Sequence, residues 1–125
     1  MFATTIRFTM PADTDWEGLR QLAVRRAFEV YRSLPGLRAL AFIFSPERSE
    51  YGGNFVWQTQ DHAEAFLRSD AWKQALALDG EAPQIERAEV CAYVEDGDLV
   101  FPPAFDVRTA SSTSAESGAS ASSPP

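Results

Sequence analysis

This sequence contains little that can hold a metal ion or a covalent cross-link. Its 125 residues include one histidine, His62, and one cysteine, Cys91. Zinc sites need three or four such ligands and a disulfide needs two cysteines, so the sequence predicts neither a metal site nor an internal cross-link. Cys91 stands in the run Glu-Val-Cys-Ala-Tyr, which is typical of a buried strand position.

Long apolar runs and an excess of positive charge are also missing. The N-terminus lacks the basic region and apolar run of a secretion signal, and no segment approaches the roughly 18 apolar residues of a membrane span. The 11 basic against 18 acidic residues give a net charge of -7, which disfavours binding to the phosphate backbone of nucleic acids. We therefore predict a soluble, cytoplasmic protein with no membrane or nucleic-acid partner.

The composition changes towards the C-terminus. From Thr109 the chain reads TASSTSAESGASASSPP, which offers alanine as its only apolar side chain. Such a segment cannot bury enough surface to offset the entropy of ordering it. We predict one domain over residues 1–105 and a disordered Ser/Ala-rich tail over 106–125. Within the domain, residues 96–105 include Val100, Phe101 and Phe105 around a Pro-Pro pair, which predicts an extended arm that packs on another surface.

Alternating and helical patterns follow one another along the first part of the chain. In FATTIRFTM, Phe2–Met10, most apolar residues fall on one face, which predicts a strand with two different environments. A capping box from Thr14 to Glu17 starts a helix whose apolar positions recur every three or four residues until Pro35-Gly36. LRALAFIFS, Leu37–Ser45, is the predicted second strand.

The same alternation continues in the second half. The polar turn PERSEYGG, Pro46–Gly53, leads to a third strand, NFVWQTQ. Asp61 is predicted to cap one helix and Ser69 a second, short helix that ends near Gly80. After Pro83 the run QIERAEVCAYVE alternates again, which predicts a fourth strand.

This order, β-α-β-β-α-β, is the ferredoxin-like α+β arrangement of an antiparallel sheet with both helices on one face. The second strand offers one of two apolar sets to the opposite face: either Leu40, Phe42 and Phe44 or Ala39, Ala41 and Ile43. The pattern leaves open which set it is. Because contiguous exposed apolar surface marks an interface, we predict a homodimer in which two sheets pack face to face and the C-terminal arm reaches across.

Three stretches carry a resemblance to a known group of proteins: LPGLRALAFIFS, GGNFVWQTQDHAEAF and SDAWKQAL. With the order of elements, they resemble the dimeric α+β barrel superfamily, in particular the antibiotic-biosynthesis-monooxygenase and YdhR-like monooxygenase group, over about Phe2 to Glu95. The resemblance implies a homodimer with a pocket in each subunit between the sheet and its helices. It also implies oxidation of small aromatic substrates, such as polyketide phenols, by dioxygen without a metal or flavin cofactor.

One branch of that superfamily degrades haem, and its helix also reads Ser-Asp, an aromatic residue and Lys, followed by a histidine that binds iron. Aligned on SDAWKQAL, that histidine corresponds to Leu76, which cannot ligate iron. Phe66 corresponds to a tryptophan that presses on the porphyrin in that branch. The resemblance therefore implies an aromatic pocket wall without haem chemistry.

Three polar residues are candidates for a catalytic role: Arg7, Asn54 and His62. His62 follows an aspartate at a helix start, where the helix dipole favours a neutral imidazole that can act as a base, although such a position is also typical of plain surface. Asn54 can donate its amide to a substrate carbonyl or close the preceding turn. Arg7 lies inside a strand, so it is functional or forms an interface ion pair with Glu86 or Glu89.

Apolar side chains are candidates for the walls of a substrate pocket, because rigid aromatic rings stack well on a flat substrate. The predicted set is Phe8, Phe55, Trp57, Phe66, Trp72 and Leu76. The alternative for each is a place in a filled core. Together with these residues, the resemblance implies a cofactor-independent monooxygenase acting on a phenol, anthrone or quinol. It leaves open a non-catalytic, small-molecule-binding dimer and an isomerase or cyclase on the same fold.

Overall fold

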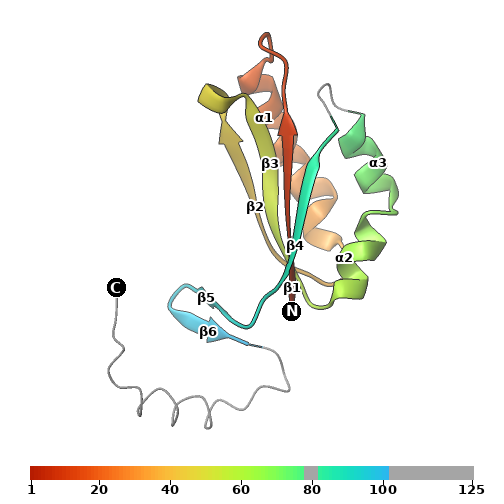
Figure 1. Ribbon diagram of the computed structural model, residues 1–125, viewed down its shortest axis with the longest axis vertical. Coiled ribbons are helices and arrows are strands. Elements are labelled where there is room, and N and C mark those ends of the chain that lie inside the picture. The colour runs from red at the N-terminus through yellow and green to blue at the C-terminus, as the bar shows by residue number, and fades with distance from the viewer. Residues whose placement is uncertain (78–81, 102–125) are drawn as a thin grey trace. The chain divides into compact units, whose positions relative to one another are not determined.

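The structure of the chain, a computed structural model, describes residues 1–77 and 82–101 (Figure 1). Its internal contacts divide the chain into two units after Cys91. The first unit holds a four-stranded sheet and the helices, and the second contains a two-stranded hairpin. The predicted tail over 106–125 lies outside the described residues.

The main sheet is antiparallel, and its strands lie in the order β2-β3-β1-β4. The four strands are β1 (Phe2–Thr9), β2 (Leu37–Ser45), β3 (Glu50–Trp57) and β4 (Gln84–Glu89). With the helices between them, this is the predicted ferredoxin-like β-α-β-β-α-β fold. The central strands β1 and β3 place Thr4 opposite Phe55 and Arg7 opposite Gly52.

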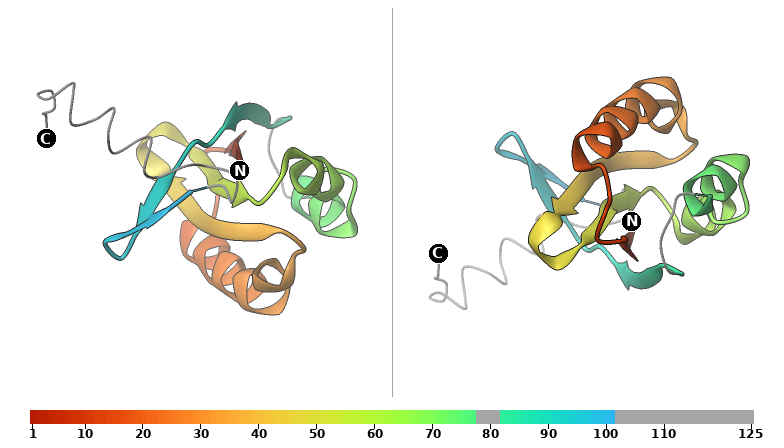
Figure 2. Two further views of the ribbon diagram at one scale, coloured as in Figure 1. Left: turned by 90° about the horizontal axis from the view of Figure 1, so that it is seen from below. Right: turned by 90° about the horizontal axis from the view of Figure 1, so that it is seen from above.

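Three helices cover one face of this sheet (Figures 1 and 2): α1 (Trp16–Glu29), α2 (Gln60–Phe66) and α3 (Asp70–Leu76). A short 3-10 turn, η1 (Tyr31–Ser33), follows α1 and carries the buried Tyr31. The buried residues of α1, Leu19 and Ala23, lie on one side of the helix. A helix of this length is only marginally stable alone, so its packing on the sheet stabilises it.

The helix starts differ from two of the three predicted caps. Asp15, not Thr14, caps α1 by accepting a hydrogen bond from the Gly18 amide at 3.0 Å. Thr59, not Asp61, caps α2 through the amide of His62. In both cases two neighbouring polar residues offer an acceptor, and the backbone turn decides which one reaches the free amide. Ser69 caps α3 as predicted.

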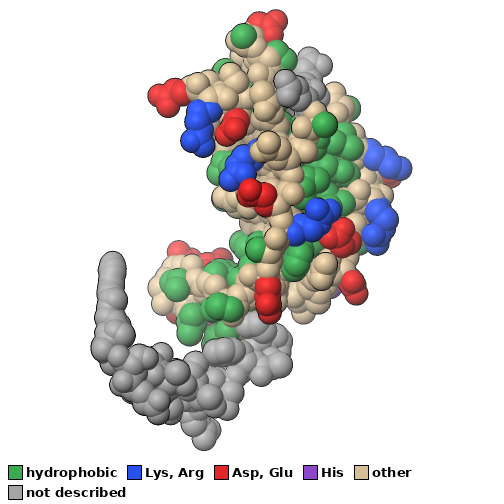
Figure 3. Space-filling view, in the orientation of Figure 1, with side chains coloured by type: hydrophobic (Ala, Val, Ile, Leu, Met, Phe, Trp, Pro, Cys, Tyr) green, Lys and Arg blue, Asp and Glu red, His purple; other side chains and the backbone are tan. Residues whose placement is uncertain are grey.

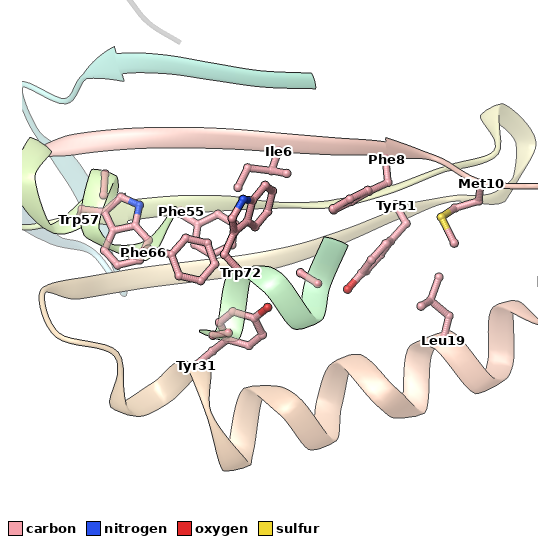
Figure 4. Close-up of a cluster of buried hydrophobic side chains, with 13 residues drawn as sticks. Ile6, Phe8, Met10, Leu19, Tyr31, Tyr51, Phe55, Trp57, Phe66 and Trp72 are labelled. Carbon is pink, nitrogen blue, oxygen red and sulfur yellow. The ribbon is translucent and has the colours of Figure 1, made fainter. Parts of the chain in front are cut away.

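The register settles which strand faces point towards the helices. Ile6 and Phe8 of β1 share that face with Tyr51, Phe55 and Trp57 of β3, and all five are buried (Figure 4). On β2 the partly buried residues packed on this core are Leu40, Phe42 and Phe44. The set left to the opposite face is therefore Ala39, Ala41 and Ile43.

The opposite face, which we call the open face, carries small and polar side chains. Thr5, Asn54 and Val56 alternate with the buried residues of β1 and β3. Figure 3 views the molecule from the side opposite α1 and shows mainly backbone and polar side chains over the strands, with acidic and basic groups side by side. The large apolar side chains lie on the helix side instead.

The third strand begins earlier than predicted. Pro46–Arg48 form a 3-10 turn and Ser49 takes a left-handed conformation with φ of 54°, so the polar turn is complete by that residue. Gly52 and Gly53, predicted to lie in the turn, are instead buried within β3. A Cβ atom on Gly52 would collide with the carbonyl oxygen of Ile6. The glycine thus allows close approach of β1 and β3.

The fourth strand ends sooner than predicted, at Glu89. Tyr93–Glu95 form β5, which pairs with β6 (Asp98–Val100) in a hairpin of the second unit. Asp96 and Gly97 at its turn both have positive φ, as a two-residue hairpin of an Asp-Gly pair requires. Cys91 precedes this hairpin and is exposed, so the prediction of a buried cysteine was wrong. Of the predicted arm over 96–105, residues from 102 on lie outside the described residues.

Candidate functional site

Aromatic side chains form a continuous cluster between the sheet and the helices (Figure 4). Phe55 stacks on Trp57 with 5.7 Å between ring centroids, and Phe66 lies 5.7 Å from Trp72. Phe8 continues the cluster at 6.1 Å from Trp72. Rings at these separations contribute favourable contacts beyond the area that they bury, so they make the interior rigid.

A small cavity lies within this cluster and is the candidate functional site; we call it the interior cavity. Its volume is about 20 Å³, roughly the space of one water molecule. The lining side chains that bear on function are Phe8, Tyr31, Phe42, Tyr51, Phe66 and Trp72. The lining within the described residues includes no carboxylate or imidazole.

Two tyrosines supply the polar groups of the interior cavity. Burial raises the pKa of Tyr51 to about 12, and the neighbouring Tyr31 adds to this rise. Burial likewise raises the pKa of Tyr31, although the positive charge of Arg26 opposes the effect. In Figure 4 both hydroxyl groups point into the space between the sheet and α1. Both are therefore neutral O–H donors at physiological pH.

Arg26, from the last turn of α1, lies beside Tyr31. Its guanidinium carbon is 5.9 Å from the centre of the Tyr31 ring, and its Nη2 donates to Gln74 Oε1 at 2.9 Å. Arg26 forms no ion pair with a carboxylate of the described chain. Its charge is thus available to stabilise an anion near the tyrosine hydroxyls.

Trp57 occupies the core next to the cavity without lining it. The side chain is completely buried, and its Nε1 donates to the hydroxyl of Thr4 at 3.0 Å. Thr4 is itself buried, so each group satisfies the other. This pairing explains why a threonine stands among the apolar residues of β1.

The three catalytic candidates do not come together in space. Asn54 and Arg7 lie on the open face, where Arg7 pairs with Glu86 at 3.1 Å. Glu86 was one of its two predicted partners, but the pair joins β1 to β4 within one chain because these strands are neighbours. The predicted placement across a dimer was wrong. A role in chemistry for Arg7 or Asn54 stays a prediction that the interior cavity does not support.

His62 lies at the start of α2, away from the interior cavity lining. Its Nδ1 is 2.7 Å from the hydroxyl of Thr59, the residue that caps α2. The ring also covers Gly36, where an added Cβ would collide with the imidazole ring. These contacts give His62 a structural role, because its ring packs where η1, β2 and α2 meet.

Four of the six predicted pocket residues line the interior cavity: Phe8, Phe55, Phe66 and Trp72. Leu76 is exposed at the end of α3 and does not line it. Tyr31 and Arg26 were not among the residues predicted for the site. The sequence does hold a signal for Tyr31, because it follows Ala23 and Ala27 of α1 at intervals of four residues and so continues their helical spacing into η1.

No known family model matches the chain, and no curated protein sequence does either. Among the residues that the structure describes, no group of three or more metal-ligating side chains is found, and no helix is long and apolar enough to cross a membrane.

Solved structures do share the fold. A provisionally assigned antibiotic biosynthesis monooxygenase from Deinococcus radiodurans matches with a TM-score of 0.61 and 17% identity, over 76% of this chain and 97% of that one. The ActVA-Orf6 monooxygenase of Streptomyces coelicolor, solved with the ligand nanaomycin D, matches with a TM-score of 0.57 and 16% identity, over 75% and 90%. A protein of unknown function from Nitrosomonas europaea gives 0.58 and 21%, over 74% and 90%.

These likenesses confirm the fold that the sequence resemblance implied. The chain shares its ferredoxin-like α+β fold with these three solved structures, and the matched region covers 90% or more of each of them.

Proposed function

We propose that the protein is a monooxygenase that oxidises a small phenol, anthrone or quinol in the interior cavity without a cofactor. The observation that carries this proposal is that two neutral tyrosine hydroxyls belong to the lining of an aromatic cavity and that the guanidinium of Arg26 lies beside one of them, Tyr31. The shared fold with a monooxygenase that was solved with the ligand nanaomycin D supports it. The interior supplies apolar, flat aromatic walls on which such a substrate can stack.

The chemistry asks little of the protein beyond binding and electrostatics. The tyrosine O–H groups and Arg26 favour the ionised form of a bound phenol, whose proton is lost to solvent. An ionised anthrone gives electrons to dioxygen directly. Overall, the methylene carbon of the anthrone becomes a carbonyl carbon: two C–H bonds break, one oxygen atom of dioxygen enters the product, and the other leaves as water with both hydrogens. The carbon supplies the four electrons that reduce dioxygen.

The size of the interior cavity sets a condition on this function. Pockets for small ligands enclose at least about 300 Å³, far more than the 20 Å³ found here. A substrate must therefore displace side chains of the lining. We expect a ligand to stabilise the protein against heat, because it fills the space that those side chains vacate.

Oxygen consumption tests the proposal. The chelator-treated protein is incubated with a panel of anthrones and hydroquinones, and uptake is recorded beside a thermal-shift measurement. Tyr51→Phe should lower kcat about 100-fold, because one donor to the developing anion is lost. Tyr93→Phe, a change of the same kind in the second unit, should leave kcat unaltered. Stabilisation by ligands without uptake would instead identify a binding protein.

We also propose that the open face joins two copies of the chain in a homodimer. No helix in the described part of the chain covers it, and its small side chains allow two sheets to approach closely. Ala41→Glu, at an exposed position of the open face halfway along β2, should give a monomer in sedimentation, whereas Ala65→Glu at an exposed position of α2 should not. Identical sedimentation of both variants would contradict the interface.

A further inference from the structure

A second, larger hollow lies at the edge of the sheet beside the interior cavity. We call it the edge groove; it measures about 310 Å³. It runs between the end of α1 with η1 and the edge strand β2, and its lining includes Ala27, Tyr31, Arg32, Leu37, Arg38 and Phe42. Its volume falls within the range of small-molecule sites, which that of the interior cavity does not.

The edge groove and the interior cavity share a wall. Tyr31 and Phe42 line both spaces, and their rings meet edge to face with 5.5 Å between centroids and an interplanar angle of 73°. A rotation of these two side chains would open the edge groove, which faces solvent, towards the interior cavity and the tyrosine hydroxyls.

Positive charge gathers in the edge groove although the chain as a whole carries a net charge of -7. Arg32 and Arg38 both line it and are exposed, and neither forms an ion pair with any described residue. The guanidinium carbon of Arg32 sits 4.0 Å from the centre of the Phe28 ring, which fixes the side chain at the rim. Two guanidinium groups without a carboxylate partner favour a carboxylate ligand, whose geometry they match.

We propose that the edge groove binds an aromatic carboxylic acid, with its ring against Tyr31 and Phe42 and its carboxylate at Arg32 and Arg38. Building on the proposed function, this makes the substrate an anionic aromatic acid that enters the interior cavity through the shared wall. The arginines hold the carboxylate at the rim of the edge groove. The aromatic ring of the substrate moves into the space that the side chains of Tyr31 and Phe42 occupy in the shared wall. Neutral aromatic molecules of the same size lack this anchor.

Calorimetric titration of the full chain tests this inference with two probes that share one ring system, naphthoic acid and the uncharged naphthalenemethanol. The acid should bind at least tenfold more tightly. The double variant Arg32→Gln/Arg38→Gln should weaken binding of the acid at least tenfold and leave that of the alcohol unchanged. The matched control is Arg25→Gln/Arg68→Gln, which removes the same charge from exposed arginines that line neither space and have no ion pair among the described residues.

The outcomes separate the two proposals. Equal affinities for the acid and the alcohol, or equal losses in the groove variant and its control, would overturn the assignment of the groove. Neither probe consumes oxygen, so selective binding of the acid supports the groove even if no anthrone is oxidised. Oxidation of neutral anthrones with no binding of naphthoic acid would leave the monooxygenase and reject the anionic substrate.

Discussion

The two faces of the sheet are built from alternate residues of the same strands and are chemically opposite. The helix side holds Phe55 and Trp57 in a buried aromatic cluster, whereas the open face carries Asn54 and Val56, which alternate with them along β3. Polar residues on the open face look catalytic in the sequence, yet the hydroxyl groups that line the interior cavity belong to tyrosines of the buried side. The difference shows that a polar residue beside an aromatic one in a strand points away from it.

Trp57→Ala, on the helix side, should lower the free energy of unfolding more than any other substitution proposed here. The variant removes a completely buried indole and leaves Thr4 without its donor, at a cost of about 3–5 kcal/mol in the free energy of unfolding. Val56→Ala, one residue earlier on the open face, should cost less than about 1.5 kcal/mol. Urea denaturation at one protein concentration measures both. Comparable losses would show that the faces do not differ in packing.

A sharper comparison changes two adjacent threonines in the same way. Thr4→Val keeps the shape of the side chain but leaves the Nε1 hydrogen of Trp57 unbonded in the core, which costs about 1–3 kcal/mol. Thr5→Val on the open face should alter stability by less than about 0.5 kcal/mol. Thermal and urea unfolding give both values. A neutral Thr4→Val would mean that water satisfies the indole.

The sequence was enough to predict the fold, because its signals were periodic. Alternation along β1 separated two environments, and the bounds of β2 agreed at both ends with Leu37–Ser45. The choice between the two apolar sets of β2 needed the register with β3, since both sets can be buried. Gly52 also escaped prediction: a Gly-Gly pair usually marks a turn, and only the approach of Ile6 shows that it belongs in a strand.

The candidate site was harder to predict than the fold. Aromatic residues were expected to line a cavity, and Phe8, Phe66 and Trp72 do so. Tyr31 comes from a 3-10 turn after a helix, and Arg26 reaches it from the preceding turn of the same segment. The spacing of Arg26 and Tyr31 in the sequence does not show that Tyr51, from β3, lies near them in space. Such contacts depend on tertiary packing, which one-dimensional patterns do not encode.

The buried side chain of Tyr51 should make the stability of the fold depend on pH in the alkaline range. The pKa of Tyr51 is about 12 in the folded state and about 10 when unfolded, so the proton is held more tightly in the fold. The stabilisation is complete below pH 10 and is lost as the pH rises through 12, with about 1.4 kcal/mol gone at pH 11. Unfolding measured from pH 9 to 12 should show a smaller slope for Tyr51→Phe. A slope equal to that of Tyr93→Phe would contradict the assignment.

Arg7→Met on the open face should have only a small effect on folding. The ion pair with Glu86 is 3.1 Å long, but the two side chains are 34% and 67% exposed, so water and salt screen it and its loss should cost less than about 1 kcal/mol. A double-mutant cycle with Glu86→Gln measures the coupling directly. If the open face joins two copies, the pair leaves water on association, and Arg7→Met should then change the dissociation constant of the dimer more than the stability of each subunit. An unchanged dissociation constant would place this pair outside any interface and leave the open face in solvent at that position.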